Sequence, residues 1–166
     1  ENVPDTTMNE IAHATVCFSR AWREALYGVS AYWILPDQVK KSAPSGEFLP
    51  KGSFTIEGQR NFIKSETLKL AVGIIQLEDN DHVLTCGPPE AIKKNSICYA
   101  IIEPNGLEMA ECAKKIRLEF LKIFEDITRK INVDEFVRAL PAGKSQIKEI
   151  SLGDLEKGKI IDNELD

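Results

Sequence analysis

Gly143-Lys144-Ser145 is the motif in this sequence that most resembles catalytic machinery, because phosphate-binding loops end in Gly-Lys followed by Ser or Thr. Such a loop also has a glycine five residues before Gly143 and follows a β-strand. Here Arg138 occupies that position, Pro141 intervenes, and the preceding pattern is helical. A nucleotide-dependent enzyme that uses Lys144 is therefore a distant alternative. We interpret the motif as a turn that closes a helix, with Lys144 available for a phosphate or an acidic partner.

Other residues that often serve in catalysis or metal binding are present, but their spacing favours neither role. The two histidines, His13 and His82, have no neighbouring Ser or Cys nucleophile in the sequence, and we interpret His13 as a packing or surface residue. The cysteines are far apart and form no C-x-x-C pair, so we expect buried free thiols and neither disulfides nor a zinc site. They are Cys17, Cys86, Cys98 and Cys112. The sequence thus predicts no enzyme, no catalytic residue, no metal and no cofactor.

The segment between residues 37 and 61 favours a different chemistry, the binding of RNA. It is long, polar and basic, and it lies between two predicted strands that would fix its ends. Many of its side chains can donate hydrogen bonds to phosphate or ribose oxygens. They are Gln38, Lys40, Lys41, Ser42, Ser45, Lys51, Ser53, Arg60 and Asn61. Tyr32 or Trp33, on opposite faces of their strand, would add a stacking surface for an unpaired base. The alternative is a loop that contacts another protein domain.

Charge is distributed unevenly along the chain. The formal net charge of -5 argues against nonspecific binding of nucleic acid by the whole surface. Residues 20–64, however, hold seven basic and four acidic side chains, which gives this span a charge of +3. The last eighteen residues hold six acidic and two basic side chains, a charge of -4, and we expect a solvated, disordered tail there. An acidic chain therefore carries one basic region, at residues 20–64.

Hydrophobic periodicity predicts an α+β fold with a mainly antiparallel sheet and two long packing helices. A capping box at Thr7-Met8-Asn9-Glu10 and an apolar stripe predict a helix over residues 7–27. A second amphipathic pattern predicts a helix over residues 107–130. Strands are expected at residues 29–35, 52–56, 68–77, 82–85 and 96–103, with 68–77 and 82–85 forming an antiparallel hairpin.

Gly87-Pro88-Pro89 is the predicted boundary within the chain. It would separate an RNA-binding region at residues 1–86 from a small α/β extension at 87–148, followed by the acidic tail at 149–166. The alternative is that the short segment after the boundary packs on the same sheet. No stretch approaches the roughly 20 apolar residues that span a bilayer, so no membrane partner is expected. Because the chain does not open with Met, we expect it to be an excised domain.

Two stretches carry motif residues at fixed spacing. They are Gln38-Val39-x-Lys41-x-Ala43-Pro44-x-Gly46-Glu47-Phe48 and Gly52-Ser53-Phe54-x-Ile56-x-Gly58-x-Arg60-Asn61-Phe62. Together with Trp22 and Tyr32-Trp33, this pattern resembles the RNA-binding domain of the NFACT family, and the form of the first stretch is similar to archaeal and eukaryotic members. Residues 85–147 resemble the C-terminal extension of archaeal members.

The resemblance implies a cytoplasmic, non-catalytic module of a ribosome quality-control factor, which recognises a stalled large ribosomal subunit that still carries peptidyl-tRNA. The implied partners are tRNA or ribosomal RNA, the large ribosomal subunit and other domains of the parent protein. The expected RNA-binding residues are Gln38, Lys40, Lys41, Ser53, Arg60, Asn61 and Trp33. Glu57 stands where many relatives are basic, which argues against phosphate binding by the predicted strand at 52–56. The alternative is a protein-interaction module whose 37–53 loop docks onto other domains or a ribosomal protein.

Overall fold

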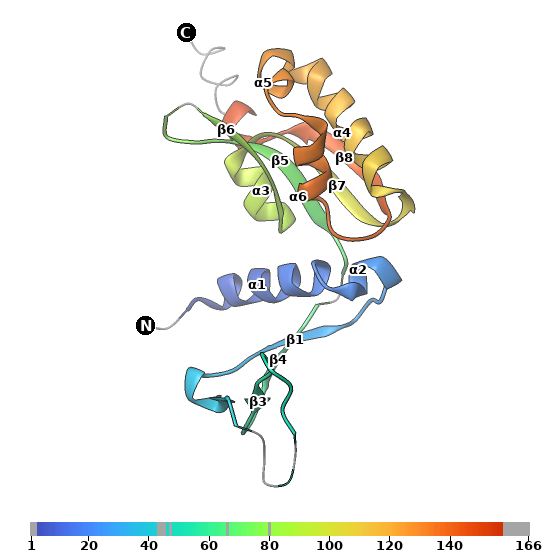
Figure 1. The fold of residues 1–166 in the computed structure, drawn as a ribbon. Coiled ribbons are helices and arrows are strands. Elements are labelled where there is room, and N and C mark those ends of the chain that lie inside the picture. The colour runs from blue at the N-terminus through green and yellow to red at the C-terminus, as the bar shows by residue number, and fades with distance from the viewer. Residues whose placement is uncertain (1–2, 43–45, 47, 66, 80, 158–166) are drawn as a thin grey trace.

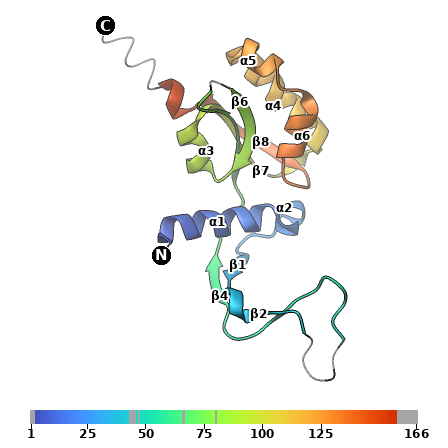
Figure 2. The same cartoon turned by 60° about the vertical axis from the view of Figure 1, so that its left-hand side comes forward.

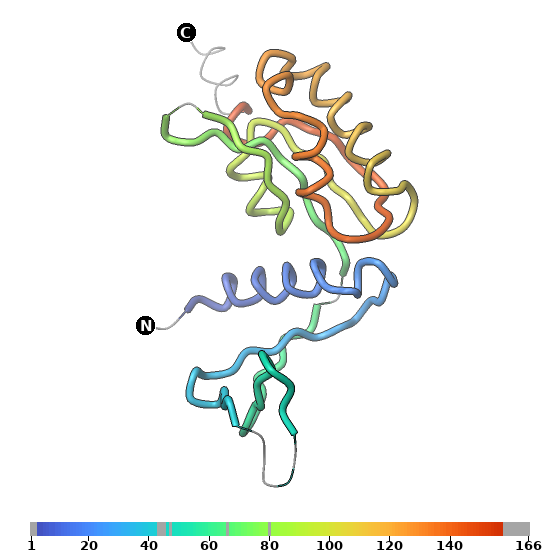
Figure 3. The backbone as a smooth tube through the Cα atoms, viewed as in Figure 1, coloured from blue at the N-terminus to red at the C-terminus, as the bar shows by residue number. Residues whose placement is uncertain are grey.

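Two short helices separate a small ribbon-and-loop region from a four-stranded sheet (Figure 1). They are α1 (Asp5–Cys17) and α2 (Arg20–Glu24). The computed structural model describes residues 3–42, 46, 48–65, 67–79 and 81–157. The backbone leaves the ribbon at residue 64 and enters the sheet at residue 70, passing the end of α1 on the way (Figure 3). None of the helices in these ranges is long and apolar enough to cross a membrane.

The single helix predicted over residues 7–27 is wrong in one respect, because Ser19 divides it. The Ser19 hydroxyl donates to the Val16 carbonyl and accepts a hydrogen bond from the Ala21 amide, so it ends α1 and caps α2. Serine competes in this way with helical backbone bonds. Helix α1 also begins at Asp5, directly after Pro4, and not at the predicted capping box.

The sheet has the strand order β6-β5-β7-β8, and every neighbouring pair is antiparallel. Its strands are β5 (Leu70–Gln76), β6 (His82–Gly87), β7 (Ser96–Leu107) and β8 (Ser145–Leu152). This confirms the α+β class, the mainly antiparallel sheet and the predicted hairpin. The sequence does not predict β8, because Lys148 and Glu149 interrupt its alternation of apolar and polar residues.

Helices cover both faces of the sheet (Figure 2). Helix α3 (Pro89–Asn95) lies on one face, where Ile92 packs against Ala71 and Tyr99. Helices α4 (Met109–Ile123) and α6 (Val133–Ala139) lie on the other face, and α5 (Glu125–Arg129) links them. The main core on that face also receives side chains from α1 and α2. Its largest fully buried members are Trp22, Phe120, Phe136, Leu70 and Ile74.

Three expectations differ from the structure in detail. The helix predicted over 107–130 is α4 followed by α5, because Phe124 leaves helical geometry (φ -134°, ψ 72°). The boundary expected at Gly87 falls inside the sheet, since β5 and β6 precede it and β7 and β8 follow it. Residues 149–152 complete β8, where half-buried Ile150 joins the core, so they do not belong to a disordered tail. Residues 153–157 of that tail are described as well, and the Gly153 amide donates to the Ile97 carbonyl. Residues 158–166 lie outside the described residues.

The ribbon consists of β1 (Ser30–Trp33) and β4 (Asn61–Lys64), which pair in antiparallel register. A short second pair, β2 (Val39–Lys40) with β3 (Thr55–Ile56), forms the base of the loop beyond it. The 3-10 turn η1 (Pro36–Gln38) joins the two pairs. This region lies on the opposite side of α1 from the sheet, and the loop extends away from both (Figure 1). The predicted strand at 52–56 is thus only its last two residues, and β4 has no counterpart among the predicted strands.

Candidate nucleic-acid interface

Gln38 fixes the base of the loop. Its Oε1 accepts a hydrogen bond from the Leu35 amide at 2.8 Å, and its Nε2 donates to the carbonyls of Glu57 and Gln59, each at 2.9 Å. The Glu57 amide in turn donates to the Gln38 carbonyl. Gly58 lies beside this side chain with φ +82°, a conformation that favours glycine. Because both amide hydrogens of Gln38 are used within the chain, this residue positions the loop.

Four cationic side chains lie on and beside the base of the loop that Gln38 fixes. The four are Lys40, Lys41, Lys51 and Arg60; Lys40 is half-buried and the others are exposed. Across the residues that the structure describes, none of them forms an ion pair with a carboxylate. In the sheet region, by contrast, Lys69 and Lys148 both pair with Glu103, at 3.4 and 3.7 Å. The loop cations are therefore available to an anionic ligand.

The open face of the ribbon carries a cluster of two aromatic rings and a guanidinium, which we call the aromatic shelf. Tyr32 and Phe62 are paired across the two strands, with ring centroids 5.5 Å apart and planes at 59°. The guanidinium carbon of Arg60 lies 5.1 Å from the Tyr32 centroid, within the range of a cation–π interaction. Ala31 and Ile63 face the other way, toward α1. The shelf is thus supported from behind and open in front.

The other predicted site residues lie apart from this shelf. Trp33 is on the α1 side of the ribbon, where it is 41% exposed beside Leu35. The Asn61 side-chain amide donates to the Trp33 carbonyl at 3.4 Å, so it bridges the two strands. Ser53 is exposed in a turn whose amide donates to the Pro50 carbonyl. Of the expected aromatic contacts, the structure therefore combines Arg60 with Tyr32 and not with Trp33.

Phe62 is the member of the shelf that our sequence analysis did not select. It is 64% exposed, although it is among the larger apolar side chains of the chain. Phe62 belongs to the motif that resembles the NFACT family, but the motif does not say which residue it faces. The Tyr32–Phe62 register becomes visible only when β4 is recognised as a strand.

The Gly143-Lys144-Ser145 motif packs against α2. Ser145 Oγ is buried and accepts a hydrogen bond from Trp22 Nε1 at 3.1 Å. A Cβ added to Gly143 would lie 2.8 Å from the Cα of Arg23 in α2. Lys144 forms an exposed ion pair with Glu108 at 3.0 Å. The motif therefore does not have the geometry of a phosphate-binding loop, and the turn that we predicted packs against α2.

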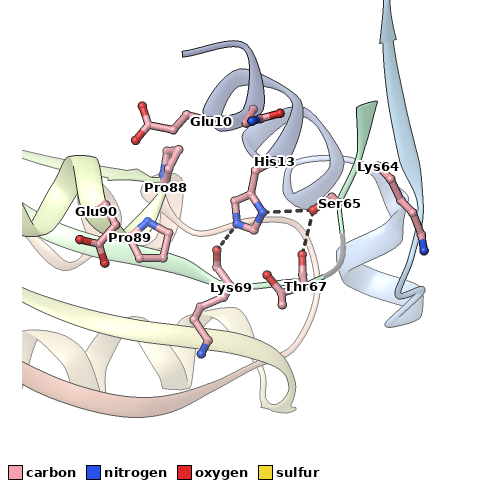
Figure 4. Close-up of a pocket in the computed structure, with 10 residues that line it drawn as sticks. Glu10, His13, Lys64, Ser65, Thr67, Lys69, Pro88, Pro89 and Glu90 are labelled. Carbon is pink, nitrogen blue, oxygen red and sulfur yellow. Dashed lines mark hydrogen bonds between the residues drawn. The ribbon is translucent and has the colours of Figure 1, made fainter. Parts of the chain in front are cut away.

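His13 lies in a pocket of about 440 Å³ between α1, the connection to the sheet and the start of α3 (Figure 4). Its Nε2 is 2.6 Å from the Lys69 carbonyl oxygen, and its Nδ1 is 3.1 Å from Ser65 Oγ. Ser65 Oγ also donates to the Thr67 carbonyl at 3.0 Å. Since both contacts of His13 join α1 to Ser65 and Lys69, His13 has a packing role.

Burial keeps the cysteine thiols protonated. Cys17, Cys98 and Cys112 are free and buried. Desolvation raises the pKa of Cys17 and of Cys112 from 9.0 to about 11, and that of Cys98 to about 12. Within the described residues, no group of three or more His, Cys, Asp or Glu side chains has the arrangement of a metal site.

Comparisons with known proteins agree with the nucleic-acid interface that the loop cations indicate. Residues 1–58 match the model of the NFACT protein RNA binding domain. The archaeal Rqc2 homolog aRqcH of Methanocaldococcus jannaschii is 33% identical over 147 residues, which are 89% of this chain and 21% of that protein. No solved structure matches the chain.

Eukaryotic relatives match as well. The ribosome quality control complex subunit NEMF homolog of Drosophila melanogaster is 32% identical over 81% of this chain and 13% of its own length. Ribosome quality control complex subunit NEMF of Homo sapiens is 37% identical over 45% of this chain and 7% of its length. The chain thus spans about a fifth or less of these relatives.

Proposed function

The chain belongs to the NFACT family of ribosome quality-control factors, and we propose on this premise that it is a non-catalytic module that binds RNA on the ribosome. Its ligand in this proposal is tRNA or ribosomal RNA on a stalled large subunit that still carries peptidyl-tRNA. The module acts in the cytoplasm, and the peptide chemistry belongs to the ribosome. Its other partners are further domains of the parent protein.

The observation that carries this proposal is the set of loop cations without carboxylate partners among the described residues. Lys41 and Arg60 are exposed, and Lys40 lies next to the Gln38 frame. Each phosphate that they neutralise releases condensed counterions, which supplies affinity without reading the base sequence. Residues 20–64 carry a formal charge of +3 in a chain of net charge -5, which favours the loop and ribbon as the place of this attraction. Backbone recognition of a folded RNA at one surface is the chemistry that fits best.

A protein-docking function is the second candidate, and one observation favours it. Phe48 and Phe54 in the same loop are 89% and 56% exposed. Exposed apolar side chains often mark protein interfaces. In this alternative the loop docks onto a ribosomal protein or another domain of the parent, and Lys40 and Lys41 lie at the rim of the contact.

Salt dependence separates the two candidates. Binding of the chain to tRNA and to purified large ribosomal subunits is measured across a series of salt concentrations. If phosphates are bound, the logarithm of the association constant falls linearly with the logarithm of salt, with a slope of about 0.7–0.9 per neutralised phosphate. The K40A/K41A/R60A variant should reduce that slope by about 2–3.

A second triple variant removes the same charge from the other region. Lys94 and Lys114 are exposed on α3 and α4, and exposed Lys130 follows α5, so K94A/K114A/K130A should keep the slope of the unmodified chain. Equal losses in the two variants would show that only net charge matters. If the chain binds neither RNA nor subunits at low salt, the RNA function is wrong and the loop is a docking surface.

A further inference from the structure

Binding of the phosphate backbone of RNA does not require the geometry of the aromatic shelf. Phosphate binding needs cations and amides, yet the ribbon turns two aromatic rings outward beside a cation. The neighbouring Ala31–Ile63 pair is directed to α1, so the alternation of the strands places Tyr32 and Phe62 on the open side. The two rings of the shelf therefore stand on a paired two-stranded element, and Arg60 lies directly before β4.

The three side chains of the aromatic shelf differ in how much of their surface is open to a ligand. Arg60 lies over the Tyr32 ring, so the guanidinium already occupies part of that π-face. Phe62 is tilted by 59° from Tyr32 and is 64% exposed, so its own face is open. A planar ligand therefore has one ring to stack on, with a cation one ring away.

The charge of Arg60 decides which class of ligand fits. Within the described part of the chain, Arg60 has no carboxylate partner. An apolar protein segment laid across the shelf would bury this charge without compensation, which is costly. A nucleotide supplies both complements, because its base has a π-face and its phosphate is an anion. In a duplex the base faces are already stacked on their neighbours, so the base must be unpaired.

We propose that the aromatic shelf binds one unpaired nucleotide, whose base stacks on Phe62 and whose phosphate pairs with Arg60. The inference rests on the proposed function and specifies its ligand: the surface takes a looped or single-stranded part of the RNA, and the loop cations bind the backbone on either side. Trp33 has no part in this contact, because it lies on the other side of the ribbon.

The test uses the full 166-residue chain and three RNA probes that share one stem. The first is a hairpin closed by an adenosine loop, the second is the same hairpin with abasic nucleotides in the loop, and the third is the blunt duplex. The unmodified chain should bind the adenosine hairpin more tightly than either of the others. The F62L variant keeps an apolar side chain in the ribbon but lacks a π-face. It should bind the adenosine hairpin about tenfold more weakly and the abasic hairpin unchanged.

Tyr27 provides the matched control, since it is an exposed aromatic residue outside the shelf, and Y27L should bind all three probes like the unmodified chain. If the unmodified chain binds the three probes equally, or F62L loses nothing on the adenosine hairpin, the shelf does not take a base, while the proposed function stands on the backbone contacts. If the unmodified chain binds no probe, no tRNA and no large subunit, both proposals fail together.

Discussion

Trp22 and Ser145, which are 123 positions apart in the sequence, share a buried hydrogen bond of 3.1 Å from the indole nitrogen to the serine hydroxyl. Trp22 belongs to α2, next to the ribbon region, and Ser145 begins β8 at the edge of the sheet. Both side chains are fully buried. Helix α2 and the sheet therefore share one core, against which Val29 and Ala31 also pack, and we expect these parts to unfold together.

Removal of the Ser145 hydroxyl should destabilise the whole chain. S145A leaves the indole N–H of Trp22 buried without an acceptor, which costs about 1–3 kcal/mol in the free energy of unfolding. Urea unfolding followed by circular dichroism measures this change. S53A removes an exposed hydroxyl and should leave the free energy of unfolding unaltered. Two separate transitions, or an S145A variant as stable as S53A, would contradict the shared core.

Alanine at position 143 should destabilise the chain by more than its backbone conformation alone explains. Gly143 has φ +128°, and a Cβ there would lie 2.8 Å from the Arg23 Cα. Gly52 has φ +87° with nothing within 4 Å of a Cβ, so G52A reports the conformational cost alone, about 1 kcal/mol. G143A should lose that amount and about 1–3 kcal/mol more from overpacking. Thermal unfolding of both variants measures the two losses in stability. Equal losses would show that α2 moves away from the added Cβ without an energetic penalty.

The buried thiols should lower stability in alkaline solution. Cys112 titrates at about 11 in the folded chain and at 9.0 when exposed. Between these pH values the unfolded chain binds fewer protons than the folded one, so the free energy of unfolding falls as pH rises. C112A has no thiol, so its deficit in stability relative to the unmodified chain should shrink from pH 9 to pH 11. A deficit that stays constant over this range would contradict the raised pKa.

Neutralising Glu57 should strengthen RNA binding. Glu57 is exposed and lies at the loop base, where its backbone carbonyl accepts from Gln38. Its carboxylate repels phosphate, so E57Q should raise tRNA affinity a few-fold at low salt, and screening should remove the gain at high salt. Glu111 is exposed on α4, so E111Q is the matched control. If E57Q has the tRNA affinity of E111Q, then RNA does not approach the second strand of the loop.

The fold could be predicted from the sequence wherever one element carries a strong periodic pattern. The hairpin of β5 and β6 and the amphipathic helix α4 have such patterns, and the α+β class follows from them. Helix α3 and strand β8 could not be predicted in this way. The first has only seven residues and begins at the second of two prolines, and the second carries charged residues that its place at the sheet edge exposes to solvent.

The candidate site was predictable in its location but not in its internal arrangement. Composition indicates the basic loop, because lysines cluster there in an acidic chain. It does not indicate that Gln38 uses its amide on main-chain atoms or that Asn61 bonds the Trp33 carbonyl. These roles depend on which strands lie opposite one another, which is a property of long-range pairing.

The hydrogen bonds of Gln38 have a further consequence for how this chain tolerates change. All three of its partners are main-chain atoms, at Leu35, Glu57 and Gln59. The frame is therefore indifferent to the side chains that the intervening loop carries. Side chains between Lys41 and Phe54, apart from Gly46 and Gly52 with their positive φ angles, can change without removing any of these three hydrogen bonds.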